Sequence, residues 1–286
     1  MGRIVLSADS ACDLSRKICE EIGLHIVPIT IILGSEERAD GIEIQPEEIY
    51  AYVEKTGTLP KTSAISSYSF KEHFQRIRQP GDSILHFSIS SKLSACHQNA
   101  VVAAGETENI HVIDGESLST GTALLILKAK ELIEKGYSAE QIAEECRNTI
   151  PFVQASFVVD TLEYLHKGGR CSGLANFVTG VFKIHPMLQL QEGSIKVAGK
   201  FRGSLKLVLG KYIEHLAETM QPDLSRGFLT YTQMDPDIVD SVREKVNELF
   251  PFKQLIEGMP NSTVNCHCGK GTLGLLFINK EPIVKK

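Results

Sequence analysis

Residues 83–114 read SILHFSISSKLSACHQNAVVAAGETENIHVID and carry the pattern from which the fold class is predicted. The apolar run 83–87 is typical of a buried strand, and a helix is expected from about Ser94. Residues 109–114 form the next strand-like run, which ends in Asp114. A strand, a helix and a second strand at this spacing indicate two parallel strands joined through a helix.

The same alternation extends to both sides of this stretch. Pro46 suits the first position of a helix, and Ser138 with Gln141 fits a capping box for another. We therefore predict a doubly wound, mostly parallel α/β sheet that binds its ligand beyond the carboxyl ends of the strands, where Asp, Ser and Thr recur. The expected strands are 4–6, 26–33, 83–87, 109–114 and 157–159, and the expected helices are 15–22, 67–77, 117–135, 138–150 and those starting at 46 and 94.

The second half of the chain has a different pattern. Glu192-Gly193-Ser194 separates two apolar runs and predicts a hairpin, and Asp235-Pro236 predicts the start of a helix. We expect a smaller α+β domain here, which divides the chain into domains at 1–160 and 161–286. The other expected elements are a helix over 204–219 and strands over 187–191, 195–200, 227–232, 253–257 and 272–278.

Composition limits the function classes. The chain has 286 residues, 42% of them hydrophobic and 23% charged, as in a folded globular protein. Its net charge of −5 argues against a general nucleic-acid binder. The N-terminus lacks the pattern of a signal peptide and no run of about 18 apolar residues occurs, so we expect a cytoplasmic protein with at most transient membrane contact. The seven cysteines are expected to be reduced thiols.

Two hydroxyl clusters are candidate anion sites. The segment 61–67, KTSAISS, follows Pro60, and the segment 88–94 contains four serines. Each could cap a helix, or each could hold a carboxylate or phosphate with hydroxyls and free backbone N–H groups. Neither segment matches a nucleotide-binding glycine loop, so a nucleotide is not indicated.

Three further segments each allow more than one interpretation. Cys266-His267-Cys268 does not have the spacing of a zinc site and is compatible with a tight turn, or with His267 as a polar partner in a pocket. Residues 165–170, LHKGGR, could end a helix or present Arg170 to a partner or phosphate. The apolar segment 171–190 could be ordinary core or the wall of an apolar tunnel.

Six segments, taken in order, resemble the DegV family of fatty-acid-binding proteins. They span nearly the whole chain, and six in register are more specific than any one of them. The segments are 9–14 (DSACDL), 62–63 (TS), 90–94 (SSKLS), 112–114 (VID), 162–165 with 168–170 (LEYL and GGR), and His267 with 269–274 (GKGTLG).

This resemblance implies a two-domain α/β fold that binds one long-chain fatty acid, without catalysis and without a metal or other cofactor. By position, Thr62, Ser63, Ser94 and His267 look like the residues that hold the carboxylate. The family also implies that some members present the acid to a separate fatty acid kinase, and Arg170 and Arg202 resemble contacts to that partner. The expected candidates for the wall of the tail cavity are Leu174, Phe177, Val178, Val181, Ile184 and Met187.

The chain departs from the family pattern at Ala64-Ile65, Ala95-Cys96-His97, His185 and Lys270. These changes leave the expected head-group hydroxyls in place but bear on the shape of the cavity. Two other functions are compatible with the same residues. One is a Ser/His hydrolase acting on an acyl ester, although no GxSxG motif is present. The other is a lipid chaperone or sensor that has no kinase partner.

Overall fold

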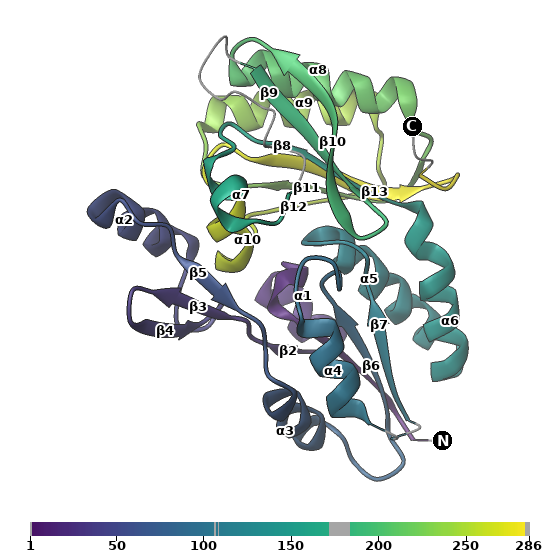
Figure 1. Cartoon of the computed structure of the whole chain (residues 1–286). Helices are drawn as coiled ribbons and strands as arrows, with labels where there is room; N and C mark the ends of the chain where they lie inside the picture. The colour runs from purple at the N-terminus through teal and green to yellow at the C-terminus, as the bar shows by residue number, and fades with distance from the viewer. Residues whose placement is uncertain (1, 106, 108, 172–183, 284–286) are drawn as a thin grey trace.

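The computed structural model describes residues 2–105, 107, 109–171 and 184–283. Within these residues the strands form three sheets, of four, six and three strands. The four-stranded sheet belongs to the N-terminal half, the six-stranded sheet belongs to the C-terminal half, and the small sheet projects to one side (Figure 1). The predicted class, a parallel α/β unit followed by an α+β unit, is therefore confirmed.

The N-terminal sheet is parallel throughout, in the order β2-β1-β6-β7. The strands of this sheet are β1 (Ile4–Asp9), β2 (Leu24–Val27), β6 (Ser83–Ser88) and β7 (Ile110–Asp114). The helices of the N-terminal half that accompany it are η1 (Ser10–Cys12), α1 (Arg16–Ile22), α3 (Ser67–Ile77), α4 (Cys96–Ala104), α5 (Thr120–Glu134), α6 (Ala139–Thr149) and η2 (Ile150–Phe152).

The capping box predicted for Ser138 and Gln141 is present at the start of α6. The Gln141 amide donates to the Ser138 hydroxyl over 3.3 Å, and the Ser138 amide donates to Oε1 of Gln141 over 2.9 Å.

The single strand expected over 26–33 is two strands in different sheets. β2 ends at Val27, Pro28 follows, and β3 (Thr30–Leu33) pairs with β4 (Glu36–Ala39) and β5 (Lys61–Ser63) in the small antiparallel sheet. Proline has no N–H for a sheet ladder and fixes its own φ, so the strand is interrupted there. As a result, Thr62 lies on a strand outside the parallel sheet.

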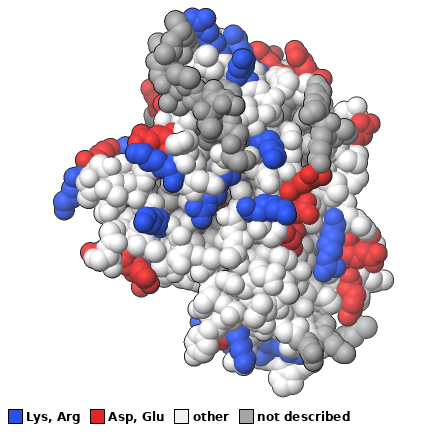
Figure 2. All heavy atoms as spheres, viewed as in Figure 1, with Lys and Arg blue, Asp and Glu red and all other residues white. Residues whose placement is uncertain are grey.

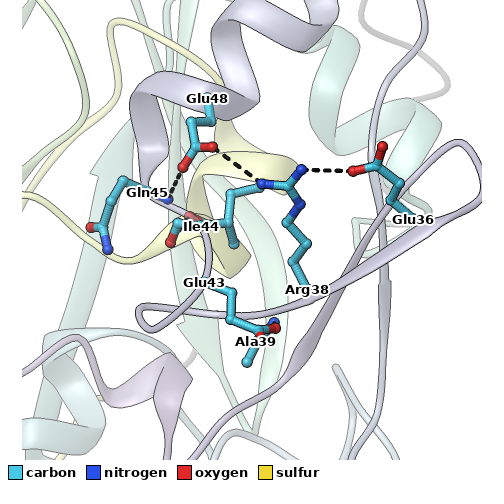
Figure 3. Close-up of polar contacts among 8 residues, drawn as sticks. Glu36, Arg38, Ala39, Glu43, Ile44, Gln45 and Glu48 are labelled. Carbon is cyan, nitrogen blue, oxygen red and sulfur yellow. Dashed lines mark hydrogen bonds and ion pairs between the residues drawn. The ribbon is translucent and has the colours of Figure 1, made fainter.

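Ionic contacts connect this small sheet to α2 (Pro46–Thr56). Arg38 of β4 lies 2.7 Å from Glu36 and 3.4 Å from Glu48 in the first turn of α2 (Figure 3). The other carboxylate oxygen of Glu48 accepts the Gln45 amide over 3.0 Å. These contacts fix the direction in which α2 leaves the sheet.

The C-terminal sheet has the order β10-β9-β8-β13-β11-β12 and is mostly antiparallel. Its strands are β8 (Val153–Val158), β9 (Ile184–Gln191), β10 (Ser194–Arg202), β11 (Pro222–Tyr231), β12 (Gln254–Gly258) and β13 (Leu273–Asn279). Helices α8 (Leu205–Thr219) and α9 (Pro236–Leu249) cover one face (Figure 1). They enclose a second core around Tyr212, Val242 and Phe277.

The last strand expected in the N-terminal half, over 157–159, is part of β8 and belongs to the C-terminal sheet. β8 pairs with β13 and β9, so its neighbours are all C-terminal. Its six residues are all buried, and a fully buried run of this kind occurs in parallel and antiparallel sheets alike. The domain boundary at residue 160 stays a prediction. Along the chain, β7 is the last strand of the N-terminal sheet and β8 is the first strand of the C-terminal sheet.

The two large sheets share one hydrophobic core. Helix α5 contacts strands of both sheets, and the core includes Leu85 of β6, Leu125 of α5 and Phe157 of β8. Two short helices, α7 (Glu163–Gly168) and α10 (Ser262–Cys268), contact each other, and α10 also contacts α2, β5 and η1. The C-terminal half therefore brings α10 against the small sheet of the N-terminal half.

Candidate functional site

A cavity of about 240 Å³ lies where β5, the segment 89–95, α7 and α10 meet. All four expected head-group residues line it: Thr62, Ser63, Ser94 and His267. Its remaining wall is largely apolar. The apolar lining residues are Ile29, Ala64, Ile89, Leu93, Ala95, Leu118, Leu165, Ile195, Val264 and Cys268.

Thr62 and His267 are joined across 205 positions of sequence. The hydroxyl of Thr62 lies 2.9 Å from Nε2 of His267. Pairing of Thr62 with Ile31 positions β5, and helix α10 presents the imidazole. Burial, followed by the positive charge of Arg170, lowers the pKa of His267 to about 4, so the ring is neutral near pH 7.

The other nitrogen of this imidazole has a confined setting. Nδ1 of His267 is buried and has no hydrogen-bond partner among the described residues. A side-chain carbon added at Gly168 would stand 2.6 Å from Nδ1. The absence of a side chain at Gly168 therefore lets α7 approach the imidazole.

Ser94 precedes helix α4 and is partly buried. Its oxygen accepts the Cys96 amide over 3.3 Å, and its hydroxyl lies 3.2 Å from Sγ of Cys96. In the first hydroxyl cluster, helix capping is confirmed for one residue, and anion binding stays a prediction. Ser66 caps α3 by accepting the Ser69 amide over 3.0 Å, whereas Thr62 faces the cavity.

Ser90 and Ser91, which precede Ser94, make structural hydrogen bonds, whereas the buried hydroxyl of Ser88 has no partner among the described residues. The hydroxyl of Ser90 donates to the carbonyl of Gly193 over 2.7 Å and so reaches the turn between β9 and β10. The Ser91 amide donates to Asp114 over 3.1 Å. Asp9 holds the adjoining wall, because its carboxylate accepts the amide of Ile89 over 2.8 Å.

Arg170 lies at the edge of the cavity and is exposed. It follows Gly169, which ends α7 with a φ of 68°, and its guanidinium donates to the carbonyl of Gly168 over 2.5 Å. Residues 165–170 therefore both end a helix and present Arg170 outward. Arg202, at the end of β10, is exposed and does not line this cavity.

The expected wall of the tail cavity lies elsewhere or outside the described residues. Leu174, Phe177, Val178 and Val181 are outside them. Ile184 is 44% exposed, and Met187 belongs to the second core with α8. The apolar residues that do line the cavity come from many elements, and in sequence they cannot be distinguished from ordinary core.

A smaller cavity of about 30 Å³ lies beside the first. Leu118, Val264 and Cys268 line both. The inner cavity continues between the start of α5 and the C-terminal sheet, where Phe157 and Leu276 form its wall. The two cavities are therefore adjacent, and the smaller one lies on the side towards the C-terminal sheet.

Two of the departures from the family pattern lie in the cavity wall. Ala64 and Ala95 both line it, and their short side chains leave space there. Ile65 is buried, and its carbonyl accepts the side chain of Asn99 over 2.7 Å.

The other two departures have local partners. His185 is buried 3.6 Å from Asp160. Lys270 pairs with Glu54 over 2.7 Å and lies 5.0 Å from the ring centre of Tyr50.

The segment Cys266-His267-Cys268 forms the end of helix α10, and the expected glycine turn follows it at 269–271. Both thiols are buried, and His267 is a polar partner in the cavity, as the other interpretation had it. Successive side chains of a helix point about 100° apart, so these three diverge. Over the described part of the chain, no group of three or more His, Cys, Asp or Glu is arranged to hold a metal ion. In the same residues, no helix is both long and apolar enough to cross a membrane.

A model of a known protein family matches almost the whole chain. The model of the family described as "Uncharacterised protein, DegV family" matches residues 3–280. The chain belongs to the DegV family. Two DegV domain-containing proteins illustrate the relation. One, from Caldanaerobacter subterraneus, is 26% identical and covers 98% of this chain and 100% of its own length. Another, from Clostridium perfringens, is 35% identical over 73% of this chain and 75% of its own length.

Solved DegV structures have the same fold. A structure described as fatty acid binding of a DegV family protein from Thermus thermophilus has a TM-score of 0.86 at 30% identity, covering 97% of this chain and 99% of that one. A stearic acid-binding protein from Eubacterium ventriosum has a TM-score of 0.84 at 26% identity, covering 98% and 99%. Both structures are thus described as binding a fatty acid, and the first is named as a DegV family protein.

Proposed function

We propose that this DegV protein binds a long-chain fatty acid, with the carboxylate at Thr62, Ser94 and His267 and the tail along the apolar cavity. The observation that carries the proposal is the Thr62–His267 pair, 2.9 Å apart, in the wall of a cavity whose other lining residues are largely apolar. The fatty-acid-binding descriptions of similar solved structures support it.

The chemistry of the pair suits a carboxylate. If Nε2–H of the neutral imidazole donates to the oxygen of Thr62, the threonine hydroxyl hydrogen is free to donate to an anion. Ser94 can donate a second hydrogen bond, and Ser63 lies beside them in the same wall. Hydrogen bonds to charged groups contribute about 1.5–3 kcal/mol each after exchange with water, and they also fix the orientation of the head group.

The tail is expected to supply most of the affinity. Burial contributes about 0.8 kcal/mol per methylene, or roughly 11 kcal/mol for about 14 methylenes, before association costs of several kcal/mol. The proposed path runs past Leu118, Val264 and Cys268 into the inner cavity.

A hydrolase acting through the same pair is less well supported. The distance from Thr62 to His267 suits a nucleophile and its base. However, a catalytic base needs an orienting group, and Nδ1 of His267 has no partner in the described residues. An assay with an ester substrate and a serine- or threonine-reactive probe tests this alternative directly.

The substitution Thr62→Val tests the head-group assignment. It keeps the shape of the side chain and removes the hydroxyl, so we expect palmitate affinity to fall by about 10-fold or more. The measurement is a titration of delipidated protein by calorimetry. Thr219→Val, at the exposed end of α8, is the control and should bind as the wild type does. Equal affinities for Thr62→Val and the wild type contradict the assignment.

We also propose that the bound acid is presented to a fatty acid kinase, with Arg170 and Arg202 as contacts to that partner. The exposed position of Arg170 beside the head-group residues supports this role. Arg170→Ala should retain palmitate and lose acyl-phosphate formation with the kinase. A large loss of palmitate affinity instead would assign Arg170 to lipid binding. If the protein binds fatty acid but no kinase that uses it as a partner is present in the cell, a lipid chaperone would be favoured.

A further inference from the structure

Asp40 is a buried carboxylate that does not line the head-group cavity. Charged side chains are spread over the face of the molecule shown in Figure 2, whereas Asp40, which follows β4, is 1% exposed. Burial raises the pKa of its carboxyl, and hydrogen bonds from Thr263 and Ser10 partly offset that effect. Because a buried carboxylate is costly unless it is hydrogen-bonded, the partners of Asp40 show which parts of the fold it holds.

The first partner of Asp40 is helix α10. Thr263 donates its hydroxyl to Oδ2 of Asp40 over 2.6 Å and its amide to Oδ1 over 3.2 Å. Thr263 and His267 are four residues apart on α10, so they lie on the same face of the helix, and both line the cavity. Holding Thr263 at two atoms therefore sets the rotation of α10 that directs the imidazole towards Thr62.

The other partners of Asp40 lead to the strand of Thr62. The amide of Asp40 donates to the carbonyl of Ile29 over 2.9 Å. The Ser10 hydroxyl donates to Oδ2 of Asp40 over 2.7 Å and accepts the Ile29 amide over 3.0 Å. Ile29 directly precedes β3, in which Ile31 pairs with Thr62 of β5. Asp40 is thus bonded to both parts of the fold that present the Thr62–His267 pair.

We propose that Asp40 is a positioning residue for carboxylate recognition. By holding Thr263 on one side and Ile29 on the other, it keeps the Thr62 hydroxyl and the His267 imidazole at the spacing that binds an acid. An ionised carboxylate suits this role because both of its oxygens only accept hydrogen bonds, whereas an amide would replace one acceptor by a donor. This inference rests on the proposed fatty-acid site, since it concerns how that site recognises the head group.

The substitution Asp40→Asn tests the proposal with two ligands of equal chain length. Laurate carries a carboxylate and 1-dodecanol a neutral hydroxyl, and both are titrated by calorimetry on delipidated protein below their solubility limits. We expect laurate affinity to fall by about 10-fold and dodecanol affinity by less than about 3-fold, because hydrogen bonds to a charged group contribute more than those to a neutral one. Loss of packing alone would weaken both ligands equally.

Asp82→Asn is the matched control. Asp82 is also a buried carboxylate, but it is bonded to Arg3 and the Gln79 amide, and it does not line the cavity. This variant should keep the wild-type ratio of laurate to dodecanol affinity, even where its Tm is lower. A change of that ratio in Asp82→Asn equal to the change in Asp40→Asn would overturn the special role of Asp40.

The imidazole itself gives a spectroscopic readout. Long-range ¹H–¹⁵N correlation spectra report the two ring nitrogens of each histidine, and the signals of His267 are assigned by their loss in His267→Asn. We expect the Nε2 shift of His267 to change in Asp40→Asn, because the hydrogen bond to Thr62 is altered, and to stay at the wild-type value in Asp82→Asn. An unchanged Nε2 shift in Asp40→Asn contradicts the proposal.

The outcomes separate this inference from the proposed function. If the wild type binds neither laurate nor palmitate, the proposed function fails. If the wild type binds laurate but Asp40→Asn weakens both ligands equally, or neither, only the role of Asp40 fails. Should Asp40→Asn not fold, as judged by circular dichroism, Ser10→Ala decides, because it removes one donor to Asp40 from outside the cavity wall. It should weaken laurate by about 3-fold or more and dodecanol by less than about 1.5-fold, and equal effects on both ligands overturn the inference.

Discussion

At the residue scale, the head-group end of the cavity depends on groups that are far apart in sequence. Thr62 comes from the small sheet and His267 from α10, and they meet at 2.9 Å. Burial keeps the imidazole neutral, because its pKa is lowered to about 4. A neutral ring can orient the threonine hydroxyl without forming an ion pair with the ligand.

The glycine at position 168 is the most specific packing requirement of this site. In Gly168→Ala the new methyl group would stand 2.6 Å from Nδ1 of His267, so the imidazole must move. We expect about a 10-fold loss of palmitate affinity, of the size of one lost hydrogen bond to a charged group. Titration calorimetry measures it.

Gly258→Ala is the matched control for this change. A side-chain carbon at Gly258 meets nothing within 4 Å, and its backbone does not have a positive φ. It should bind palmitate as the wild type does. Wild-type affinity in Gly168→Ala would show that the position of His267 is not important for binding.

Much of the polar end could be predicted from residues and resemblance together. The segments containing Thr62, Ser63, Ser94 and His267 were singled out, and the structure brings these four side chains around one cavity. Residue patterns alone left helix capping and anion binding open. This ambiguity is physical, because a hydroxyl near a helix start can serve either purpose: Ser66 caps α3, whereas Thr62, four residues earlier, lines the cavity.

At the element scale, helix α3 is joined to the parallel sheet through buried histidines. The hydroxyl of Ser7 on β1 lies 2.9 Å from Nε2 of His73 on α3 and 2.9 Å from Nδ1 of His86 on β6. Burial lowers the pKa of His73 to about 4 and that of His86 to about 3. Both rings are therefore neutral in the folded protein at pH 7.

These shifts predict a loss of stability in acid. The folded pKa values lie below 6.5, the ordinary value for histidine, so the contribution is fully present above pH 6.5 and is lost as pH falls towards 4 and 3. Each titrating histidine costs about 1.4 kcal/mol per pH unit in this window. His86→Asn keeps a group that can bond Ser7 and should show a shallower fall of Tm between pH 6.5 and 4 than the wild type.

His166→Asn, at an exposed position on α7, serves as the control and should keep the wild-type slope. An unchanged slope in His86→Asn would contradict the account of buried neutral histidines. Asp9 acts in the opposite direction: burial raises its pKa from 3.8 to about 7, so its contribution is fully present below pH 3.8 and is lost as pH rises towards 7. The wild type and both variants contain Asp9, so the difference between their slopes reports the histidine that was replaced.

Element positions were predictable where local signals are strong. The helices at 67–77 and 204–219 and the hairpin around Gly193 match α3, α8 and β9–β10 closely. The errors concern which strands pair with one another. Pro28 redirects the chain into a third sheet. The strand β8 was expected in the N-terminal sheet but pairs in the C-terminal sheet, and the sequence does not show this because a buried run does not specify its neighbours.

At the scale of the whole molecule, the apolar cavity lies where the two halves meet. Its lining combines Ile29 and Leu118 of the N-terminal half with Ile195 and Val264 of the C-terminal half. A wall assembled from both halves cannot be read from the periodicity of any one segment, and the segment 171–190 was singled out for its apolar content alone. Such a wall requires the tertiary structure.

A substitution on the shared wall tests the path of the tail. Val264 lines both cavities, so the larger side chain in Val264→Phe should obstruct the passage. We expect palmitate affinity to fall by about 10-fold or more while decanoate, with six fewer carbons to bury, changes much less. Competition binding of the two acids measures this preference.

Val101→Phe, at a position 41% exposed on α4, is the control and should leave the preference unchanged. If Val264→Phe weakens both acids equally, the tail does not pass this point. A loss of folding in that variant is recognised by circular dichroism, and Val264→Leu then provides the milder obstruction.

Denaturing mass spectrometry of lipid extracted from the purified protein tests the central claim most directly. The account predicts close to one long-chain fatty acid per wild-type chain, and much less in Thr62→Val purified in the same way. Recovery of no fatty acid, even after incubation with palmitate, would contradict it.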